Sequence, residues 1–452
     1  MTVRLIDSLA TTEPMAKLFS DESVLGAMLE FEVALARAEA RAGVIPKKAA
    51  EAIAASAKVN RFDMPALTRA ALRAGTPAIP MVKAFTEQIR KRDADAARFV
   101  HWGATSQDVA DSAMSMLLKR AASILSSDLA ALENALAKLS AEHKQSVMLG
   151  RSLLQAAPPV TFGLKAAGWR ASVRRGGESL RKAFHDATIL QFGGASGTLA
   201  FLGSKGKTVA AALAKELNLE LPEAPWHTQR DRWATLICAC GVLTGSLGKM
   251  ARDISLLMQN EVDEAAEPGG EGRGGSSTMP HKRNPIACSL TLAAAHRLPG
   301  LVSSYLSAMV QEHERAVGGW QAEWPIISAS IQSTGVAIAS MAEVAEGLLV
   351  NPKHMRTNIE KTNGVIFAER AMMLLGSKLG RDVAHQILET ASKKCVAENR
   401  HLSEVLAENP EVKQRLDRTT LQDLEVPEKY LGCAEEFRRA LLSTSATQKR
   451  KP

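Results

Sequence analysis

The stretch LKRAASILSSDLAALENALAKL, residues 118–139, decides the fold. Its leucines recur every seven residues, and two more leucines fill the intervening position: Leu118, Leu125, Leu132 and Leu139, then Leu129 and Leu136. Such a heptad pattern is typical of a long helix that packs against neighbouring helices at a shallow angle. The leucines lie inside a run, residues 104–149, that contains no glycine and no proline, and we predict a long helix there.

Three further segments have the apolar, alanine-rich composition of long helices: residues 228–262, 299–317 and 326–350. The first contains three glycines spaced for close contact between helices, Gly241, Gly245 and Gly248. Alternating runs of β-branched and aromatic residues, which indicate strands, are scarce along the chain. We therefore predict an all-α protein with a central bundle of long helices.

The chain of 452 residues is longer than one ordinary domain, and we divide it into three. Residues 1–103 are expected to form an N-terminal domain of shorter helices, one of which begins after the N-cap residue Ser20. The apolar stripe of that helix consists of Val24, Met28, Phe31 and Leu35. Residues 104–363 are expected to form the central bundle, and residues 364–452 a C-terminal helical domain with a short disordered basic tail, QKRKP.

The composition argues against membrane insertion, secretion and metal binding. No apolar run reaches the roughly 18 residues that a membrane span needs, and the N-terminus lacks the features of a signal peptide. The cysteines are scattered and form no paired CxxC motifs: Cys238, Cys240, Cys288, Cys395 and Cys433. We expect idle thiols, no metal and no membrane partner in a cytoplasmic protein.

The net charge of +8 at pH 7 raises the possibility of a nucleic-acid partner. However, lysine and arginine are spread along the chain, and aromatic residues make up only 4% of it, too few for base-stacking platforms. We expect no nucleic-acid partner. A modest positive charge also suits a protein that attracts a small anionic substrate.

The loop GGEGRGGSSTMPHKRNP, residues 269–285, interrupts the helical regions. It exceeds the 2–8 residues that usually connect two helices. Its glycines permit unusual backbone conformations, Ser276 offers a hydroxyl, Lys282 a cation, and Asn284 both a donor and an acceptor. The composition alone fits either a lid over a ligand or a solvated linker.

The order of residues in this loop resembles a known signature. GSSTMPHKRNP, residues 275–285, is similar to the GSSxMPxKxNP loop of the fumarase/aspartase superfamily. Three further stretches resemble regions of that superfamily: HWGATSQDVADSA at 101–113, GRSLLQAAPPVTFG at 150–163 and GGASGT at 193–198. The resemblance implies an all-helical, three-domain subunit in a homotetramer whose active sites are shared between subunits.

One departure from the superfamily narrows the expected reaction. Adenylosuccinate lyases of the superfamily carry a histidine in GRTHxQ that can protonate a departing amine, and the matching residue here is Leu153. Leucine donates no proton, which favours a reaction whose leaving group is a weak base such as a carboxylate. The stretch QEHERAVGGWQAEWP, residues 311–325, is also similar to the HERA…W…EWP stretch of the superfamily's 3-carboxy-cis,cis-muconate cycloisomerases.

The resemblance therefore implies a cofactor-independent cycloisomerase without a metal. Its substrate would be a small tricarboxylate, 3-carboxy-cis,cis-muconate, interconverted with 4-carboxymuconolactone in the protocatechuate branch of the β-ketoadipate pathway. It also implies that Ser276 delivers the proton, while Lys282 and Arg315 bind carboxylates and stabilise the aci-carboxylate. The remaining substrate-binding residues that it implies are His101, Thr105, Ser106, Gln155 and Asn284.

Alternatives stay open at this point. Arg315 could be a surface residue paired with Glu312 or Glu314, and the nearby tryptophans could serve packing alone. An adenylosuccinate-type lyase is a rival, although the only tyrosines are Tyr305 and Tyr430, so the nucleotide-binding Arg-Tyr pair of those lyases is missing near the N-terminus. A structural protein that reuses the scaffold is a second rival, and the intact signature loop argues against it.

Overall fold

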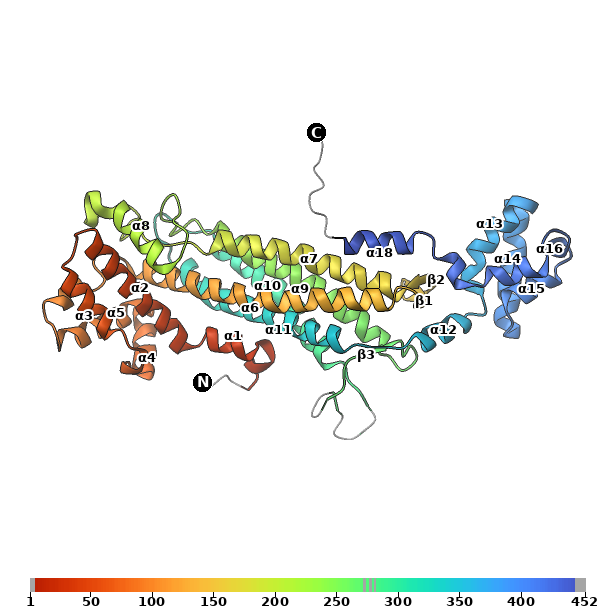
Figure 1. The fold of residues 1–452 in the computed structure, drawn as a ribbon, viewed down its shortest axis with the longest axis horizontal. Helices are drawn as coiled ribbons and strands as arrows, with labels where there is room; N and C mark the ends of the chain where they lie inside the picture. Colours follow the sequence, from red (N-terminus) through yellow and green to blue (C-terminus); the bar gives the residue numbers. More distant parts are fainter. Residues whose placement is uncertain (1–4, 271–273, 276–278, 280–281, 444–452) are drawn as a thin grey trace. The chain divides into compact units, whose positions relative to one another are not determined.

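The structure is a computed structural model that describes residues 5–270, 274–275, 279 and 282–443 (Figure 1). Ser276 and the basic tail lie outside these residues. The chain forms two compact units. Unit 1 comprises residues 1–130, 175–248 and 290–340, and unit 2 comprises residues 131–174, 249–289 and 341–452. The division into domains at 1–103, 104–363 and 364–452 remains a prediction.

Helices dominate the described chain, which confirms the all-α prediction. In chain order they are α1 Glu13–Leu18, α2 Asp21–Arg41, α3 Lys47–Ser56, α4 Met64–Ala74, α5 Ala78–Arg90, α6 Ser106–Glu142, α7 Phe162–Ala187, α8 Gly206–Leu217, α9 Asp231–Leu257, α10 Ile286–Ala308, α11 Gly319–Gly347, α12 Pro352–Glu360, α13 Ala368–Leu379, α14 Arg381–Glu398, α15 Leu402–Glu408, α16 Pro410–Arg415, α17 Arg418–Leu424 and α18 Ala434–Leu442. The strands form two antiparallel pairs, the hairpin of β1 Val147–Ser152 with β2 Gln155–Thr161, and β3 Ala265–Ala266 with the sequence-distant β4 Leu349–Val350.

The heptad leucines lie on α6 and are buried, as the pattern predicts. The helix ends at Glu142, before the glycine- and proline-free run does, and the chain enters strand β1 at Val147. The polar residues 142–146 interrupt the apolar repeat, and Val147 then pairs with Thr161 of β2. A run free of glycine and proline thus allows a helix without requiring one.

Two of the three predicted glycine contacts exist on α9. A Cβ at Gly248 would lie 2.6 Å from Ala295 of α10, and a Cβ at Gly241 would lie 3.1 Å from Val302 of the same helix. The prediction is wrong for Gly245, where an added Cβ would meet nothing within 4 Å among the described residues. Glycine therefore permits close packing of α9 on α10 at two levels within unit 1.

Helix α10 begins thirteen residues earlier than predicted, at Ile286, and Pro299 lies inside it. Proline is common at the first position of a helix, where its missing N–H does no harm, but here it lies within the helix. The observed start is capped instead by the buried carboxylate of Glu267, which accepts the backbone N–H groups of Ala287 at 3.1 Å and Cys288 at 2.7 Å. Distant side chains of this kind leave no local sequence signal.

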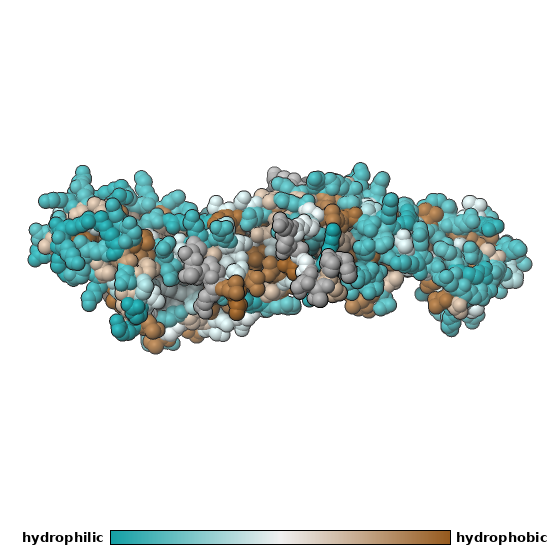
Figure 2. Space-filling model, turned by 90° about the horizontal axis from the view of Figure 1, so that it is seen from below, coloured by the Kyte–Doolittle hydropathy of each residue, from teal (hydrophilic) through white to brown (hydrophobic). Residues whose placement is uncertain are grey.

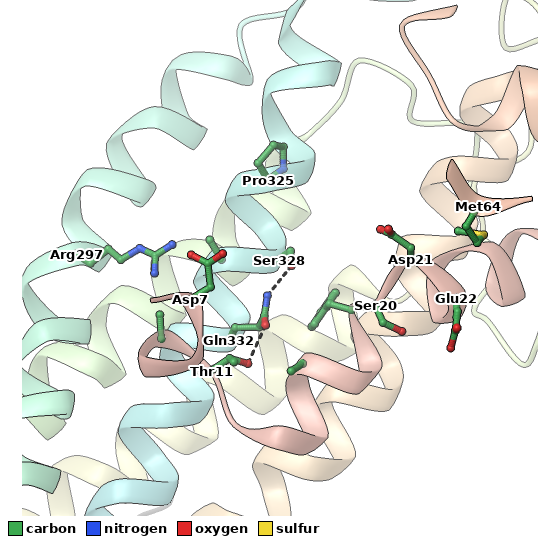
Figure 3. Close-up of a pocket in the computed structure, with 14 residues that line it drawn as sticks. Asp7, Thr11, Ser20, Asp21, Glu22, Met64, Arg297, Pro325, Ser328 and Gln332 are labelled. Carbon is green, nitrogen blue, oxygen red and sulfur yellow. Dashed lines mark hydrogen bonds between the residues drawn. The ribbon is translucent and has the colours of Figure 1, made fainter. Parts of the chain in front are cut away.

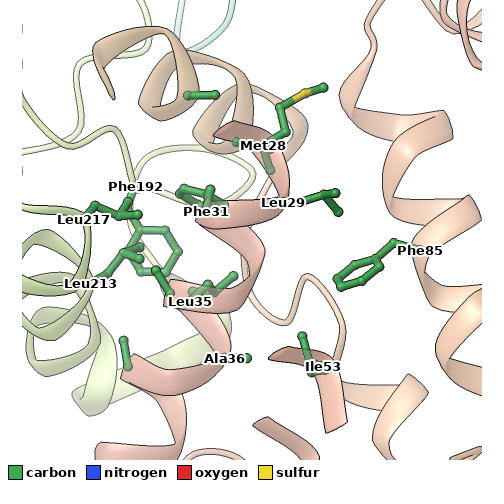
Figure 4. Close-up of a cluster of buried hydrophobic side chains, with 14 of the residues drawn as sticks. Met28, Leu29, Phe31, Leu35, Ala36, Ile53, Phe85, Phe192, Leu213 and Leu217 are labelled. Atoms are coloured by element: carbon green, nitrogen blue, oxygen red, sulfur yellow. The ribbon is translucent and has the colours of Figure 1, made fainter. Parts of the chain in front are cut away.

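The N-terminal part of unit 1 is built around α2 (Figure 4). Its predicted N-cap is confirmed, since the hydroxyl of Ser20 accepts the backbone N–H of Ser23 at 3.3 Å. Met28, Phe31 and Leu35 are buried in the core that α2 forms with α3, α5 and α8. Figure 4 shows Phe31 and Leu35 on the side of α2 where Leu213 and Leu217 lie, with Phe85 on the other side.

Three described helices are long and apolar enough to cross a membrane by length and composition, namely α9, α10 and α11. The expectation that no segment reaches this threshold is therefore wrong. Within the most apolar windows of α9 and α11, 56% and 67% of the residues are buried in the protein. For α10 the share is 28%, so much of its apolar surface faces outward. Helices that are apolar on most sides are typical of the interior of large bundles as well as of membranes.

Candidate active site

Two of the stretches that carry the resemblance meet at the start of α6, in unit 1. The carboxylate of Asp108, which is fully buried, accepts the backbone N–H groups of Thr105 at 3.0 Å, Gly193 at 3.0 Å and Gly194 at 2.9 Å. A Cβ at Gly193 would lie 2.7 Å from Pro225, so a side chain there would push the turn away. Asp108 therefore ties the glycine turn at 193–198 to the first turn of α6.

Arg315 is held at the same helix end by three hydrogen bonds. Its Nη1 donates to the hydroxyl of Thr105 at 2.5 Å, its Nη2 to the hydroxyl of Ser106 at 3.1 Å, and its Nε to Oε1 of Gln107 at 3.3 Å. Glu312, one of the surface partners considered above, accepts the backbone N–H of Val317 instead. The structure thus brings together three of the predicted site residues, Thr105, Ser106 and Arg315.

This arrangement suits an anion. The first N–H groups of a helix have no partner within it and carry partial positive charge, and a guanidinium adds a full positive charge beside them. Each Nη nitrogen carries a second N–H besides the one that meets a hydroxyl. A carboxylate placed here would meet a planar cation that favours two-point contacts, together with rotatable hydroxyls.

His101 lies just before this cluster and contacts the acidic side of α2. Its Nδ1 is 2.7 Å from Oε1 of Glu32, which is buried. Burial lowers the pKa of His101, but the charge and hydrogen bond of Glu32 outweigh burial and raise the pKa above its ordinary value. The backbone of His101 is left-handed, with a φ of 59°, which costs free energy in a residue with a side chain. The imidazole is therefore fixed in place by a specific partner.

The sequence did not predict the buried ionic network that lies near Arg315 and is centred on Arg230. Arg230 is fully buried and donates to Asp111 at 2.7 Å and to Glu323 at 2.6 Å. Its guanidinium carbon lies 4.6 Å from the ring centroids of both Trp226 and Trp233. Burial alone would lower the pKa of Arg230, but the two carboxylates outweigh it and raise the pKa. Asp111 could have been suspected from the 101–113 stretch, whereas Arg230 lies in none of the quoted motifs.

The remaining predicted residues belong to unit 2 and are described there by themselves. Gln155 is exposed and begins β2, opposite Ser152. Lys282 is exposed, and its N–H donates to the carbonyl of Met279 at 3.0 Å. The N–H of Asn284 donates to the carbonyl of Gly274 at 3.0 Å, which closes the base of the signature loop. Ser276 is not among the described residues.

Leu153 and Leu154 form the two-residue turn between Ser152 and Gln155. Both have left-handed backbones, with φ of 51° and 65°, and their residues are 94% and 77% exposed. Such turns favour Asn and Gly, because they need a positive φ at both positions, where the Cβ of most residues is crowded against the backbone. Two exposed leucines in a strained turn are unfavourable in water, so a further contact that covers them would stabilise the protein.

A separate polar pocket of about 570 Å³ lies in unit 1 between the N-terminal segment, α10 and α11 (Figure 3). Figure 3 shows Asp7 and Arg297 on one side and Asp21 and Glu22 on the other. The hydroxyl of Thr11 donates to Gln332 at 2.7 Å across it. None of the predicted site residues lines this pocket. Among the described residues, no group of three or more His, Cys, Asp or Glu side chains could hold a metal ion.

Comparisons with known proteins agree with this architecture. The family described as "Lyase" matches residues 9–300, and the family described as "Adenylosuccinate lyase C-terminus" matches residues 364–440. A 3-carboxy-cis,cis-muconate cycloisomerase of Bradyrhizobium diazoefficiens is 47% identical, over 97% of this chain and 98% of that protein. One of Pseudomonas aeruginosa is 46% identical, over 96% of this chain and 95% of that protein.

A solved structure is also similar over nearly the full chain. The crystal structure of 3-carboxy-cis,cis-muconate lactonizing enzyme from Pseudomonas putida has a TM-score of 0.92 and is 43% identical. The match covers 97% of this chain and 98% of that one. Given the family match over most of the chain and relatives of this similarity along nearly its whole length, the chain belongs to the lyase family of the fumarase/aspartase superfamily.

Proposed function

We propose that the protein is a cycloisomerase that interconverts 3-carboxy-cis,cis-muconate and 4-carboxymuconolactone without a cofactor. The observation that carries this proposal is the 47% identity to a cycloisomerase of that name over nearly the full length of both proteins. The cluster of Arg315, Thr105 and Ser106 at the start of α6 supports it, because a substrate with three carboxylates needs cationic and hydroxyl partners.

Lactonisation needs no protein acid to protonate a leaving group. In lactonisation a carboxylate oxygen of the substrate adds to a carbon of a double bond, and a proton adds to the neighbouring carbon. The attacking oxygen is already ionised and belongs to the same molecule, so positioning supplies much of the rate. Leu153, exposed at the hairpin tip, is compatible with a reaction that needs no proton donor there.

Within this proposal each residue has a role. Ser276 delivers the proton to carbon, and Lys282 and Arg315 bind carboxylates and stabilise the aci-carboxylate. His101, Thr105, Ser106, Gln155 and Asn284 complete the binding site. Negative charge develops on the carboxylate next to the protonated carbon, which is where fixed cations lower the barrier.

We also propose that the protein is a cytoplasmic homotetramer whose active sites are shared between subunits. Two features support association. Only 28% of the most apolar stretch of α10 is buried, and Val242 on α9 and Leu306 on α10 are 66% and 43% exposed. Hydrophobic residues also gather amid hydrophilic ones on the face shown in Figure 2. Large exposed apolar patches mark interaction surfaces in soluble proteins.

Product analysis distinguishes this proposal from its rival. Purified protein should convert 3-carboxy-cis,cis-muconate into a lactone identified by NMR, with uptake of one proton per molecule because three carboxylates become two and an ester. The rival is an adenylosuccinate-type lyase. It is retained because residues 364–440 match the family described as "Adenylosuccinate lyase C-terminus". Cleavage of adenylosuccinate, with no lactone formed from the muconate, would replace the proposal by that rival.

A further inference from the structure

The orientation of Arg315 depends on a buried amide, that of Gln107 in the first turn of α6. Gln107 is 1% exposed, and its Oε1 accepts from Nε of Arg315 at 3.3 Å. The hydroxyls of Thr105 and Ser106 can rotate and exchange donor and acceptor roles, but an amide oxygen only accepts. The contact with Gln107 is therefore the one that fixes the guanidinium in a single orientation.

The amide itself has only one acceptable orientation. Its Nε2 lies 3.1 Å from Oδ2 of Asp111 and 2.8 Å from the carbonyl oxygen of His227, and both of these atoms are acceptors. Turning the amide over would set its oxygen against two oxygens and its NH₂ against a guanidinium, which only donates. The oxygen of Gln107 must face Arg315.

The two acceptors are themselves held rigidly. Asp111 also accepts from Arg230 at 2.7 Å and from the indole N–H of Trp320 at 3.0 Å. Nε2 of His227 forms a hydrogen bond with Oδ1 of Asp108 at 2.8 Å. The ring of Trp320 in turn lies near Arg315, with 6.0 Å between the guanidinium carbon and the ring centroid. The buried network thus reaches Arg315 both through Gln107 and through Trp320.

We infer that Gln107 is a positioning residue of the active site, which fixes the Nε edge of Arg315 and thereby aims its free Nη hydrogens at a substrate carboxylate. The inference rests on the proposed function for the identity of the substrate. It predicts weaker substrate binding, because Gln107 is buried and acts on the substrate only through Arg315.

The variant Gln107→Met tests the inference, because methionine has nearly the same length and lacks the amide. Losing one hydrogen bond to a charged group weakens an interaction by about 1.5–3 kcal/mol, so KM for the muconate should rise at least about tenfold. The turnover number kcat should fall as well, because Arg315 also stabilises the aci-carboxylate, so the rise in KM is the readout that tests the positioning of Arg315. The matched control is Gln88→Met on α5, a half-buried amide that donates to the carbonyl of Arg61 at 3.1 Å. Its KM should not change.

Calorimetry with tricarballylate, a saturated tricarboxylate, separates this inference from the proposed reaction. Gln107→Met should bind it about tenfold more weakly than the unaltered protein, and Arg315→Ala should not bind it at the site. Should Gln107→Met fail to fold, Gln107→Asn keeps an amide that is one methylene too short to reach Arg315, with the same expectation.

If the protein binds tricarballylate and Gln107→Met binds it more weakly, but the muconate is not turned over, the proposed reaction fails and the inference stands. Three results would overturn the inference: equal affinity of Gln107→Met and the unaltered protein, no tricarballylate binding by the unaltered protein, or a loss of kcat at constant KM. An equal loss of affinity in Gln88→Met would overturn it as well.

Discussion

At the scale of single residues, the site is organised by carboxylates that are not exposed to solvent. Asp108 accepts three backbone N–H groups, and Asp111 accepts from an arginine, an indole and an amide. Buried charges are costly unless they are paired and hydrogen-bonded. Here the pairing keeps the first turn of α6 and the loop that carries Arg315 in fixed relation within unit 1.

Replacing Arg315 by lysine should weaken substrate binding strongly. Lysine keeps the charge but offers a compact ammonium in place of a planar fork, so it cannot meet Thr105, Ser106 and a carboxylate together. We expect kcat/KM for the muconate to fall by about 10–100-fold, through both KM and kcat, because Arg315 binds a carboxylate and stabilises the aci-carboxylate. Steady-state kinetics measure this, and an unchanged KM would remove Arg315 from substrate binding.

Replacing Ser276 by alanine should abolish most of the proton transfer. A positioned acid or base contributes about 10²–10⁴-fold to a rate, so kcat should fall by at least about 100-fold. Circular dichroism and the melting temperature should match those of the unaltered protein. Near-normal turnover by a folded Ser276→Ala variant would show that another group delivers the proton.

At the scale of elements, α2 carries a buried carboxyl group that makes the free energy of unfolding depend on pH. Glu39 is fully buried, and neither of its carboxyl oxygens has a hydrogen-bond partner among the described residues. Burial, and secondarily the charge of Glu32 seven residues earlier on the helix, raise its pKa from 4.5 to about 9. The group is therefore neutral in the folded protein at pH 7.

The stability of the protein should depend on pH through this group. Between pH 4.5 and about 9, Glu39 holds a proton when folded and releases it when unfolded, so the free energy of unfolding falls as the pH rises. Glu39→Gln removes this dependence and should stabilise the protein at pH 8 by on the order of 5 kcal/mol, with little difference at pH 4.

Melting temperatures of both proteins across this pH range measure the effect. The control is Glu30→Gln on the same helix, where the glutamate is half exposed and pairs with Arg120. Its melting temperature should follow that of the unaltered protein at each pH. A constant difference between Glu39→Gln and the unaltered protein from pH 4 to pH 8 would contradict the assignment.

The sequence predicted the elements that carry their own periodicity. The heptad leucines predicted α6, and the apolar stripe and Ser20 predicted α2. It did not predict the start of α10, which depends on the distant carboxylate of Glu267. Nor did it predict the β1–β2 hairpin, whose turn consists of two leucines in place of the usual Asn and Gly.

The same limit applies to the site. Thr105, Ser106 and Arg315 could be named because they lie in stretches that resemble the superfamily, and the structure brings them together. Arg230 lies in none of these stretches, and Gln107 and Asp111 lie in one of them without standing out, because the importance of all three comes from burial and mutual pairing. Neither property is visible in a linear pattern.

At the scale of the whole molecule, sharing of active sites between subunits can be tested by mixing. Arg315→Ala and Ser276→Ala chains, each nearly inactive, should regain activity when they are unfolded together and refolded as mixed tetramers. The gain arises because some shared sites then receive an intact residue from each chain. Sedimentation analysis should show tetramers in each case, and mixed tetramers without regained activity would argue that both residues act within one subunit.

The central claim is the cycloisomerase reaction itself. The most direct measurement follows the ultraviolet absorbance of the conjugated diene of 3-carboxy-cis,cis-muconate with the purified protein in the presence of a metal chelator. The absorbance should fall at a rate proportional to protein concentration, and 4-carboxymuconolactone should accumulate in equal amount. No loss of absorbance with folded protein, or a loss that stops when the chelator is added, would contradict this account.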